Sequence, residues 1–383
     1  MNDFSSLRVA FISGTLGQGG AEKQAAYIVR SLVKAGAHVR LYSLSQGEYY
    51  ESILQALGVS PVWVGRYSYF VLRLLALAIA LRDFRPHVIQ STHFYTNLYA
   101  VLLSSFYRAA GIGSIRNDAI YEMDANPFWG KWLLKGPNFL IANSYLAQSN
   151  AVLLGINQEK IHVLPNVINL VDFDAQSDKQ LNVLDRSFSS RVVIMTIGRL
   201  VPAKRFDRFI TALGLAYQKN KSILGLIVGD GPERMHLEAV ARQENLSSDV
   251  LLFLGRRDDI PALLSQAHIF ISTSDNEGFP NVILEAMAAR LPVITMPAGD
   301  SDRVVQDNIT GYVVPFDDVA KLASYMTMLA QSPELRRKLG LAGRDRVEKL
   351  YSIEHLTEKL MAIYSRIALQ SQSRRLMEAL SVK

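Results

Sequence analysis

The sequence predicts an α/β protein of two domains, each built around a parallel β-sheet with helices on both faces. The chain has 383 residues, which is too long for one typical core and suits two. Short apolar runs, typical of buried strands, alternate with helical stretches, as they do in parallel sheets. This alternation starts twice, near residue 7 and near residue 192, on either side of a polar stretch at 172–190.

The expected elements follow from this pattern in chain order. In the first half, buried strands are expected at 7–13, 39–44, 61–64, 88–91 and 139–143, with a helix at about 21–34. In the second half, strands are expected at 192–198, 225–229, 250–255, 269–271 and 293–295.

The amino-acid composition indicates a folded globular protein without disulfides. Hydrophobic residues make up 49% and charged residues 20%, which is typical of a folded globular chain. Cysteine is absent, which excludes disulfides and Cys-based metal sites and fits a reducing compartment. The first residues lack a basic segment followed by an apolar core, so we expect no signal peptide and a cytoplasmic protein.

The formal net charge of +6 points to an anionic partner. Nucleic acid, an anionic membrane and a phosphorylated substrate all fit such a charge. The sequence holds no helix-turn-helix, zinc-finger or RNP-like pattern, so we expect no nucleic-acid partner.

Residues 277–285 carry the most informative motif, EGFPNVILE, after the expected strand at 269–271. Glu277 is expected in the loop at the carboxyl end of that strand. Glu285 is expected about two turns into a helix at 281–290. Ligands of open α/β sheets bind at this edge, where a helix N-terminus favours phosphate. The alternative is that Glu277 caps the helix and Glu285 is a solvated carboxylate.

This motif resembles the E-x7-E signature of retaining glycosyltransferases of family 4, which have the GT-B architecture. The resemblance covers nearly the whole chain and implies two Rossmann-like domains that face each other across a cleft. It implies an acceptor-binding domain at 1–170, a nucleotide-sugar-binding domain at 171–355, and a C-terminal helix at 356–383 that crosses back to the first domain.

The resemblance assigns donor-binding roles in the second half. Residues 198–207 resemble the family pattern G-R-L-x-x-x-K-x-x-D, in which Arg199 and Lys204 would clamp the donor diphosphate. The alternative is an ordinary basic loop in which Lys204 pairs with Asp207. Glu277 would lie near the sugar and the diphosphate, and Glu285 would accept hydrogen bonds from the ribose. The other expected donor contacts are Gly229, Arg256, Gly278, Phe279 and Asn281.

Residues 17–22 resemble the family's G-G-A-E loop, which opens the first helix. There the amides of Gly19 and Gly20 would bind the donor phosphate or a phosphorylated acceptor. The glycine spacing does not match G-x-G-x-x-G, so a nicotinamide dinucleotide is not expected.

Acceptor contacts are expected at two strand ends of the first half. His93 follows the strand at 88–91 and would bind the acceptor or orient a hydroxyl, with a purely structural role as the alternative. Many relatives carry His where this chain has Arg116 or Asn117. Arg116 would bind a phosphate and Asp118 would assist acceptor deprotonation, unless the two form only a surface ion pair.

The resemblance implies front-face attack, in which the leaving phosphate helps to take the acceptor proton and the protein supplies orientation and charge. We expect no cofactor beyond the co-substrate, a UDP- or GDP-sugar. Asp172 and Asp174 formally match a metal-binding D-x-D motif but fall between the domains, so a metal-independent enzyme is expected.

Two segments suggest peripheral membrane contact, at the inner face of a membrane, and therefore a glycan or lipid-linked acceptor. Residues 67–81 are apolar with interspersed Arg, and residues 126–139 combine Trp, Phe and Lys. Both are shorter than the roughly 20 apolar residues of a spanning helix but suit an interfacial one. A buried helix is the alternative.

Two other functions remain open. An epimerase or phosphorylase with GT-B architecture would also bind the donor, and an epimerase would place acid/base carboxylates around it. An inactive sugar-nucleotide-binding subunit would fit the missing family His.

Overall fold

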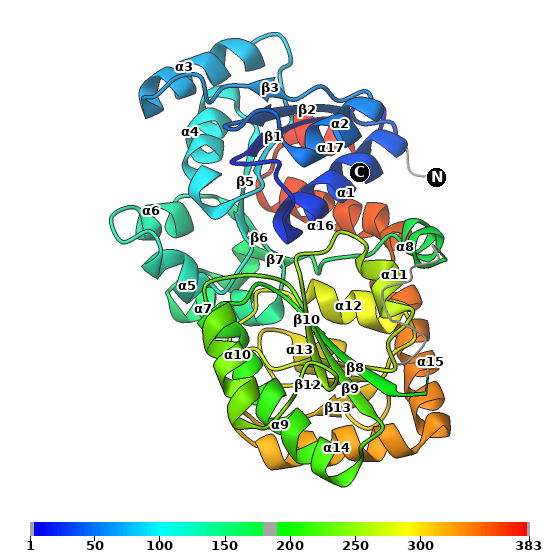
Figure 1. Cartoon of the computed structure of the whole chain (residues 1–383). Helices are drawn as coiled ribbons and strands as arrows, with labels where there is room; N and C mark the ends of the chain where they lie inside the picture. The colour runs from blue at the N-terminus through cyan, green and yellow to red at the C-terminus, as the bar shows by residue number, and fades with distance from the viewer. Residues whose placement is uncertain (1–3, 179–189, 381–383) are drawn as a thin grey trace. The chain divides into compact units, whose positions relative to one another are not determined.

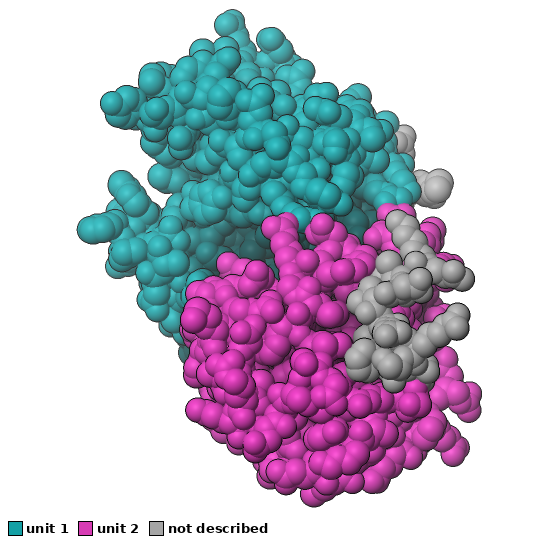
Figure 2. All heavy atoms as spheres, in the orientation of Figure 1, with its two compact units in different colours: residues 1–167, 353–383 teal, residues 168–352 magenta. Residues whose placement is uncertain are grey.

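The computed structural model describes residues 4–178 and 190–380 and divides the chain into two compact units. Unit 1 comprises residues 1–167 and 353–383, and unit 2 comprises residues 168–352 (Figure 2). The sequence analysis places these divisions after residues 170 and 355. Of the polar stretch expected at 172–190, residues 179–189 lie outside the described residues.

Unit 1 is built on a seven-stranded parallel sheet with the order β3-β2-β1-β4-β5-β6-β7. The strands are β1 (Arg8–Ser13), β2 (His38–Ser43), β3 (Val62–Trp63), β4 (Val88–Ser91), β5 (Ala110–Ile115), β6 (Phe139–Ala142) and β7 (Ile161–Val163). The helices are α1 (Gly20–Lys34), α2 (Tyr49–Ala56), α3 (Phe70–Leu81), α4 (Asn97–Tyr107), α5 (Ala119–Asp124), α6 (Gly130–Lys135), α7 (Tyr145–Leu153), α16 (Leu356–Gln370) and α17 (Arg374–Ala379).

Side chains of β1 alternate between two cores, as the period of a strand requires. Val9 and Phe11 pack with α1, α2 and α16 on one face, whereas Ala10 and Ile12 pack with α3 and α4 on the other (Figure 1). A sheet covered on both faces needs apolar residues at every strand position, which explains the continuous apolar runs in the sequence.

The C-terminal segment returns to unit 1, as the sequence analysis expects. Leu360 and Tyr364 of α16 are fully buried in the core that also holds α1, and the Tyr364 hydroxyl donates to Gln90 Oε1 of β4 at 2.7 Å. The segment forms two helices rather than one, because the chain turns at Gln372, which has a φ of 50°.

Unit 2 repeats the design with a six-stranded parallel sheet of order β10-β9-β8-β11-β12-β13. The strands are β8 (Val192–Ile197), β9 (Ile223–Val228), β10 (Leu251–Gly255), β11 (Ile269–Ser272), β12 (Val293–Thr295) and β13 (Gly311–Val313). The helices are α8 (Leu170–Ser177), α9 (Phe206–Lys219), α10 (Arg234–Gln243), α11 (Ile260–Leu264), α12 (Asn281–Ala288), α13 (Ser301–Val304), α14 (Val319–Gln331) and α15 (Pro333–Leu350). The helices again cover both faces, because Ile194 of β8 packs with α9 and α14, whereas Met195 packs with α8 and α12.

Two sequence expectations are wrong in detail. The strand expected to be buried at 61–64 is the edge strand β3, whose Val62 and Trp63 are 44% and 41% exposed because it has a neighbour on one side only. The expected linker begins with α8, which Asn169 caps by accepting from the Asp172 amide.

The strand order gives each sheet a topological switch point. This is the place where the connections from two adjacent strands lead to opposite sides of the sheet. It lies between β1 and β4 in unit 1 and between β8 and β11 in unit 2. The loops that follow these four strands, together with the helices that those loops lead into, hold most of the residues that the sequence analysis singled out.

Candidate functional sites at the two sheet edges

The loops that follow β8 and β11 are hydrogen-bonded to each other in unit 2. The Asp275 amide donates to Ala203 O at 2.9 Å, and Thr273 Oγ1 donates to Lys204 O at 3.0 Å. The Lys204 ammonium forms a salt bridge with Glu277 Oε1, which also accepts from Ser274 Oγ at 2.7 Å. The fold therefore brings the predicted Lys204 and Glu277 into contact.

The alternative pairing of Lys204 with Asp207 is absent. Asp207 binds Arg205 instead, with 2.9 Å between Oδ2 and Nη2. Glu277 does not cap the following helix either, because Pro280 is the N-cap residue of α12 and no side chain caps it.

A buried arginine that the sequence analysis missed supports these loops. Arg208 of α9 is 4% exposed, and its guanidinium donates to Thr273 O at 3.2 Å. It also forms ion pairs with Asp275 and Asp317. A buried guanidinium needs several acceptors, so this network fixes the loop that carries Glu277. The signal available in the sequence was a lone Arg in an otherwise apolar helix face.

Glycines allow the loops at this edge to approach one another. Gly229 has a φ of 139°, and a Cβ there would lie 1.9 Å from Gly198 O. Its amide donates to Gly255 O at 2.8 Å, which places the predicted Arg256 in the adjoining loop. Gly299 has a φ of 62°, and a Cβ there would lie 2.6 Å from Glu277 O. Only residues without a side chain fit both positions.

The remaining predicted donor residues lie along the same edge. Arg199 is exposed, and within the described part of the chain its guanidinium makes no hydrogen bond or ion pair. Phe279 is buried, with its ring 5.9 Å from that of Tyr351, and Gly278 is also buried. Because α12 begins at Asn281, Glu285 lies about one turn into the helix rather than two.

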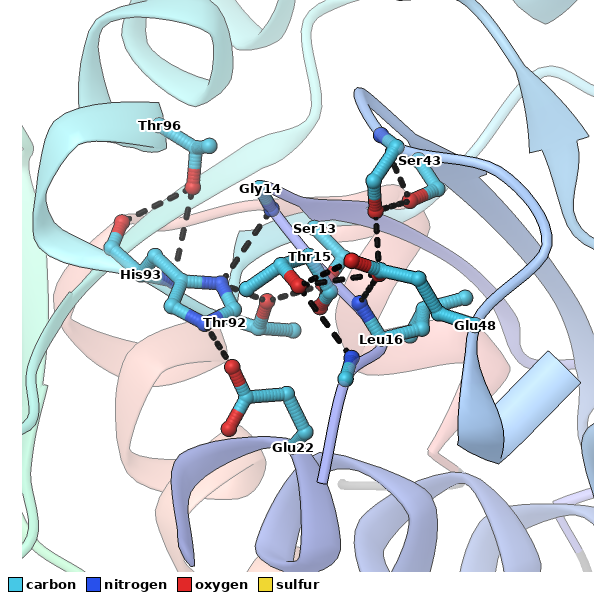
Figure 3. Close-up of polar contacts among 12 residues, drawn as sticks. Ser13, Gly14, Thr15, Leu16, Glu22, Ser43, Glu48, Thr92, His93 and Thr96 are labelled. Atoms are coloured by element: carbon cyan, nitrogen blue, oxygen red, sulfur yellow. Dashed lines mark hydrogen bonds and ion pairs between the residues drawn. The ribbon is translucent and has the colours of Figure 1, made fainter. Parts of the chain in front are cut away.

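In unit 1, His93 joins the loops that follow β1 and β4 (Figure 3). Its Nδ1 accepts from the Gly14 amide at 3.2 Å, so the ring proton is assigned to Nε2, which donates to Glu22 Oε1 at 3.2 Å. The ring also stacks on Tyr95, with centroids 5.4 Å apart. Both ring nitrogens are thus engaged in holding the loop and the first turn of α1.

The glycine loop before α1 is held by a carboxylate that the sequence analysis did not identify. Glu48 accepts from Thr15 Oγ1 at 2.8 Å and from the Leu16 amide and Ser45 Oγ (Figure 3). Burial opposes ionisation, but these hydrogen bonds outweigh it and lower the pKa of Glu48. The sequence could have indicated Glu48 only by its position, because it follows β2 at the same edge of the sheet.

The predicted Gly19 and Gly20 begin α1. Gly19 is the N-cap residue, with extended backbone and no side-chain cap, and Gly20 is the first helical residue. A Cβ on Gly19 would lie 2.2 Å from Glu22 Oε2, so a larger residue there would have to displace the Glu22 carboxylate. The first-turn amides of a helix lack intrahelical partners, which makes this end suited to an anion.

Arg116 and Glu122 are partly buried ionisable groups beyond β5. The Nε and Nη2 atoms of Arg116 are buried without a hydrogen-bond partner among the described residues. Burial lowers the pKa of Arg116 to about 10, against the opposing effect of the Glu22 charge. Burial likewise raises the pKa of Glu122 to about 7. Sequence analysis missed Glu122 because nothing in the sequence reveals its burial.

The side chains of Asp118 and Asn117 both accept hydrogen bonds around the start of α5. Asp118 Oδ1 accepts from the Ile120 amide at 3.2 Å, which caps α5, and from Asn150 Nδ2 at 2.6 Å. Asn117 Oδ1 accepts from the Asp118 amide at 2.9 Å. Among the ion pairs of the described residues, the alternative pair of Arg116 with Asp118 is not found.

The formal D-x-D pair lies in α8, not in a linker. Asp174 binds Arg344 of α15 at 2.7 Å, and this hydrogen bond lowers the pKa of Asp174. Asp172 accepts from Asn169. Across the described residues, no three His, Asp or Glu side chains gather into a group able to hold a metal ion.

Two family models match the chain. One, described as Glycosyltransferase Family 4, matches residues 18–172, and the other, described as Glycosyl transferases group 1, matches residues 185–346.

Curated relatives are similar at low identity. An N-acetyl-alpha-D-glucosaminyl L-malate synthase of Bacillus anthracis is 27% identical over 55% of this chain and 56% of its own length. This chain thus spans about half the length of the first curated relatives it matches. A Campylobacter jejuni enzyme is 23% identical over 94% of this chain and 99% of its own length. Its name is GalNAc-alpha-(1->4)-GalNAc-alpha-(1->3)-diNAcBac-PP-undecaprenol alpha-1,4-N-acetyl-D-galactosaminyltransferase.

Solved structures share the fold. HepE of Anabaena in complex with UDP and glucose has a TM-score of 0.80 at 17% identity, covering 94% of this chain and 99% of that one. Sucrose-phosphate synthase of Thermosynechococcus elongatus has a TM-score of 0.77 at 19% identity, covering 95% and 100%. The fold is therefore that of the GT-B glycosyltransferases, as the sequence analysis expects.

Proposed function

We propose that this chain, which belongs to the family 4 glycosyltransferases, transfers a sugar from a nucleotide-sugar donor to a glycan or lipid-linked acceptor. The observation that carries the proposal is the Lys204–Glu277 contact at the switch point of unit 2. A cation and a carboxylate held together at the carboxyl ends of parallel strands suit a diphosphate next to a polyhydroxyl group.

In the proposed reaction, the bond between the anomeric carbon and the donor phosphate breaks, and a bond to the acceptor oxygen forms on the same face. Because attack and departure use the same face, configuration is retained without a protein nucleophile, and the acceptor proton passes to the leaving phosphate. Lys204 and the exposed Arg199 would offset the charge that grows on the diphosphate. Glu277 would orient the sugar, and Glu285 the ribose.

We propose a metal-independent reaction with a UDP- or GDP-sugar as co-substrate. Lys204 and Arg199 supply positive charge where a divalent ion would otherwise be needed, and Asp174 is committed to Arg344. The UDP bound in the HepE structure supports a uridine donor. Full activity in the presence of a chelator is expected, and a rate restored only by added Mg²⁺ or Mn²⁺ would contradict it.

We place the acceptor side in unit 1, at Arg116, Asn117, Asp118 and His93. His93 would position the loop rather than bind directly, since both ring nitrogens are engaged. The undecaprenol-linked saccharide in the name of the Campylobacter jejuni relative supports a lipid-linked acceptor. Such an acceptor would place the enzyme in the cytoplasm, at the inner face of a membrane.

Nucleotide release distinguishes this reaction from its alternatives. The full chain is incubated with the donor that binds it, with and without lipid-linked or free saccharide acceptors, and free nucleotide is measured. Release that requires an acceptor is expected. Conversion of the donor sugar without release would indicate an epimerase. Binding without either reaction, unchanged in Glu277→Ala, would indicate an inactive binding subunit.

A further inference from the structure

An apolar helix of unit 1 lies largely exposed. Only Leu77 and Leu81 of α3 are buried, although the sequence analysis allowed that the whole helix is buried. The exposed apolar residues of this segment are Tyr69 (73%), Val71 (61%), Leu72 (45%), Leu75 (54%) and Ile79 (74%). Leu72, Leu75 and Ile79 follow helical spacing, so they form a stripe along one face.

A second exposed apolar group adjoins it. The segment that leads into α6 exposes Phe128 (89%), Trp129 (62%) and Trp132 (67%), and α4 exposes Phe106 (74%). Helix α4 contacts both α3 and α6, and the three helices lie along one side of unit 1 (Figure 1). Exposed apolar surface of this extent marks a binding face.

The charges around this surface have one dominant sign. Helix α3 and residues 125–136 contain no Asp or Glu. Exposed cations border the surface, namely Arg66, Arg82, Arg85, Arg108, Lys131 and Lys135, and the acids at the border are Asp83 and Asp124. Arg375 of α17 adds to this border, because it donates to Tyr107 O at 3.1 Å and to Arg85 O at 3.2 Å.

We propose that this face docks unit 1 onto an anionic lipid bilayer. Helix α3 would lie in the plane of the interface, with its apolar stripe toward the acyl chains, and the aromatic residues before and within α6 would enter the headgroup region. Each Lys or Arg near an anionic surface adds about 1 kcal/mol of attraction, which a neutral bilayer does not provide.

The mode of attachment is interfacial rather than spanning. Within the parts of the chain that the structure describes, no helix is both long and apolar enough to cross a bilayer. Interleaved Trp and Lys favour lipid over a second copy of this chain, because the two acids at the border, Asp83 and Asp124, are too few to pair with its cations.

Vesicle co-sedimentation of the full chain tests the proposal. We expect binding to vesicles of phosphatidylcholine mixed with phosphatidylglycerol, weaker binding to phosphatidylcholine alone, and loss of that preference in Lys131→Glu/Lys135→Glu. Leu75→Asp/Ile79→Asp and Trp129→Ser/Trp132→Ser should each lower the partition coefficient at least about tenfold. Met235→Asp, at an 81% exposed apolar residue of unit 2, is the matched control and should bind as wild type does.

Three results would overturn the proposal. These are wild-type protein that stays in the supernatant, variants that sediment as wild type does, and equal binding to both kinds of vesicle. A wild-type dimer in lipid-free buffer that Leu75→Asp/Ile79→Asp converts to monomers would assign the face to a second copy instead.

The melting temperature, and its shift with nucleotide sugar, are measured on every variant. Unchanged values show that the variants are folded and that donor binding is intact, because the substituted residues lie outside the donor site. If wild-type protein binds vesicles but no nucleotide sugar, docking stands and the transferase proposal fails. If wild-type protein binds a nucleotide sugar but no vesicles, the docking proposal fails and the transferase proposal stands.

Discussion

At the scale of single residues, the charge on Glu277 acts on two partners with opposite consequences. It neutralises Lys204 by direct contact, and it would repel a diphosphate drawn to the same ammonium. Glu277→Gln keeps the shape and the hydrogen bond from Ser274 but removes the charge. We therefore expect UDP, measured by calorimetry, to bind as tightly as to wild type or up to about tenfold tighter.

The same substitution should lower the transfer rate by about 100-fold, because orientation of the sugar in the transition state is lost. Lys204→Ala is the matched variant and should weaken UDP binding instead. Weaker UDP binding in Glu277→Gln would contradict this account of the pair.

Glu122 should make stability depend on pH. Burial raises its pKa in the folded protein to about 7, from an ordinary value of 4.5. Between these values the folded protein keeps a proton that the unfolded chain has released, so the free energy of unfolding falls as pH rises toward 7. Glu122→Gln should flatten this fall and add about 1–3 kcal/mol at pH 8, measured by urea unfolding. If the free energy of unfolding of Glu122→Gln changes with pH in parallel with that of wild type, the pKa of Glu122 is not raised.

At the scale of elements, the close approach of the loops after β8 and β9 depends on Gly229. Gly229 and Gly255 both have a positive φ, but a Cβ on Gly229 would overlap Gly198 O whereas one on Gly255 would meet nothing within 4 Å. Gly255→Ala should therefore cost only backbone strain, about 1 kcal/mol. Gly229→Ala should cost more and also weaken donor binding about tenfold or more, because it displaces the loop before Lys204.

Urea unfolding and a donor titration on both variants separate these effects. Equal losses of stability and equal donor affinity in the two variants would show that the overlap relaxes without moving the site.

Strands that begin with adjacent β-branched residues could be predicted from the sequence, and strands interrupted by glycine or polar residues could not. The strands β4 and β12 have the predicted bounds, because each begins with the β-branched pair Val-Ile. The bounds of β5 were not predicted, since its Gly111 and Gly113 weaken the strand pattern. Those glycines are needed because a Cβ would lie 2.3 Å from Ser104 Oγ and 2.6 Å from Pro137 Cγ, respectively. The short strands β7 and β13 were not predicted because, unlike β12, neither begins with two adjacent β-branched residues.

At the scale of the whole molecule, motif spacing located the candidate site but not its internal contacts. Lys204 and Glu277 were both singled out, yet 73 residues separate them, and only the strand order of unit 2 explains their contact. Glu48, Arg208 and Glu122 were missed because their roles arise from burial and from partners distant in sequence. The exposure of α3 was likewise invisible, since an apolar run predicts burial in a soluble core and insertion in an interface equally well.

The most direct test of the central claim is the melting temperature of the full chain against a panel of nucleotides and nucleotide sugars, in wild type and in Lys204→Ala. Binding to the folded state raises the melting temperature, by about 2.7 kcal/mol of stabilisation at a ligand concentration 100 times the Kd. We predict a shift with one nucleotide sugar that is lost in Lys204→Ala. No shift with any of them, or an equal shift in both proteins, would contradict a donor site at the Lys204–Glu277 pair.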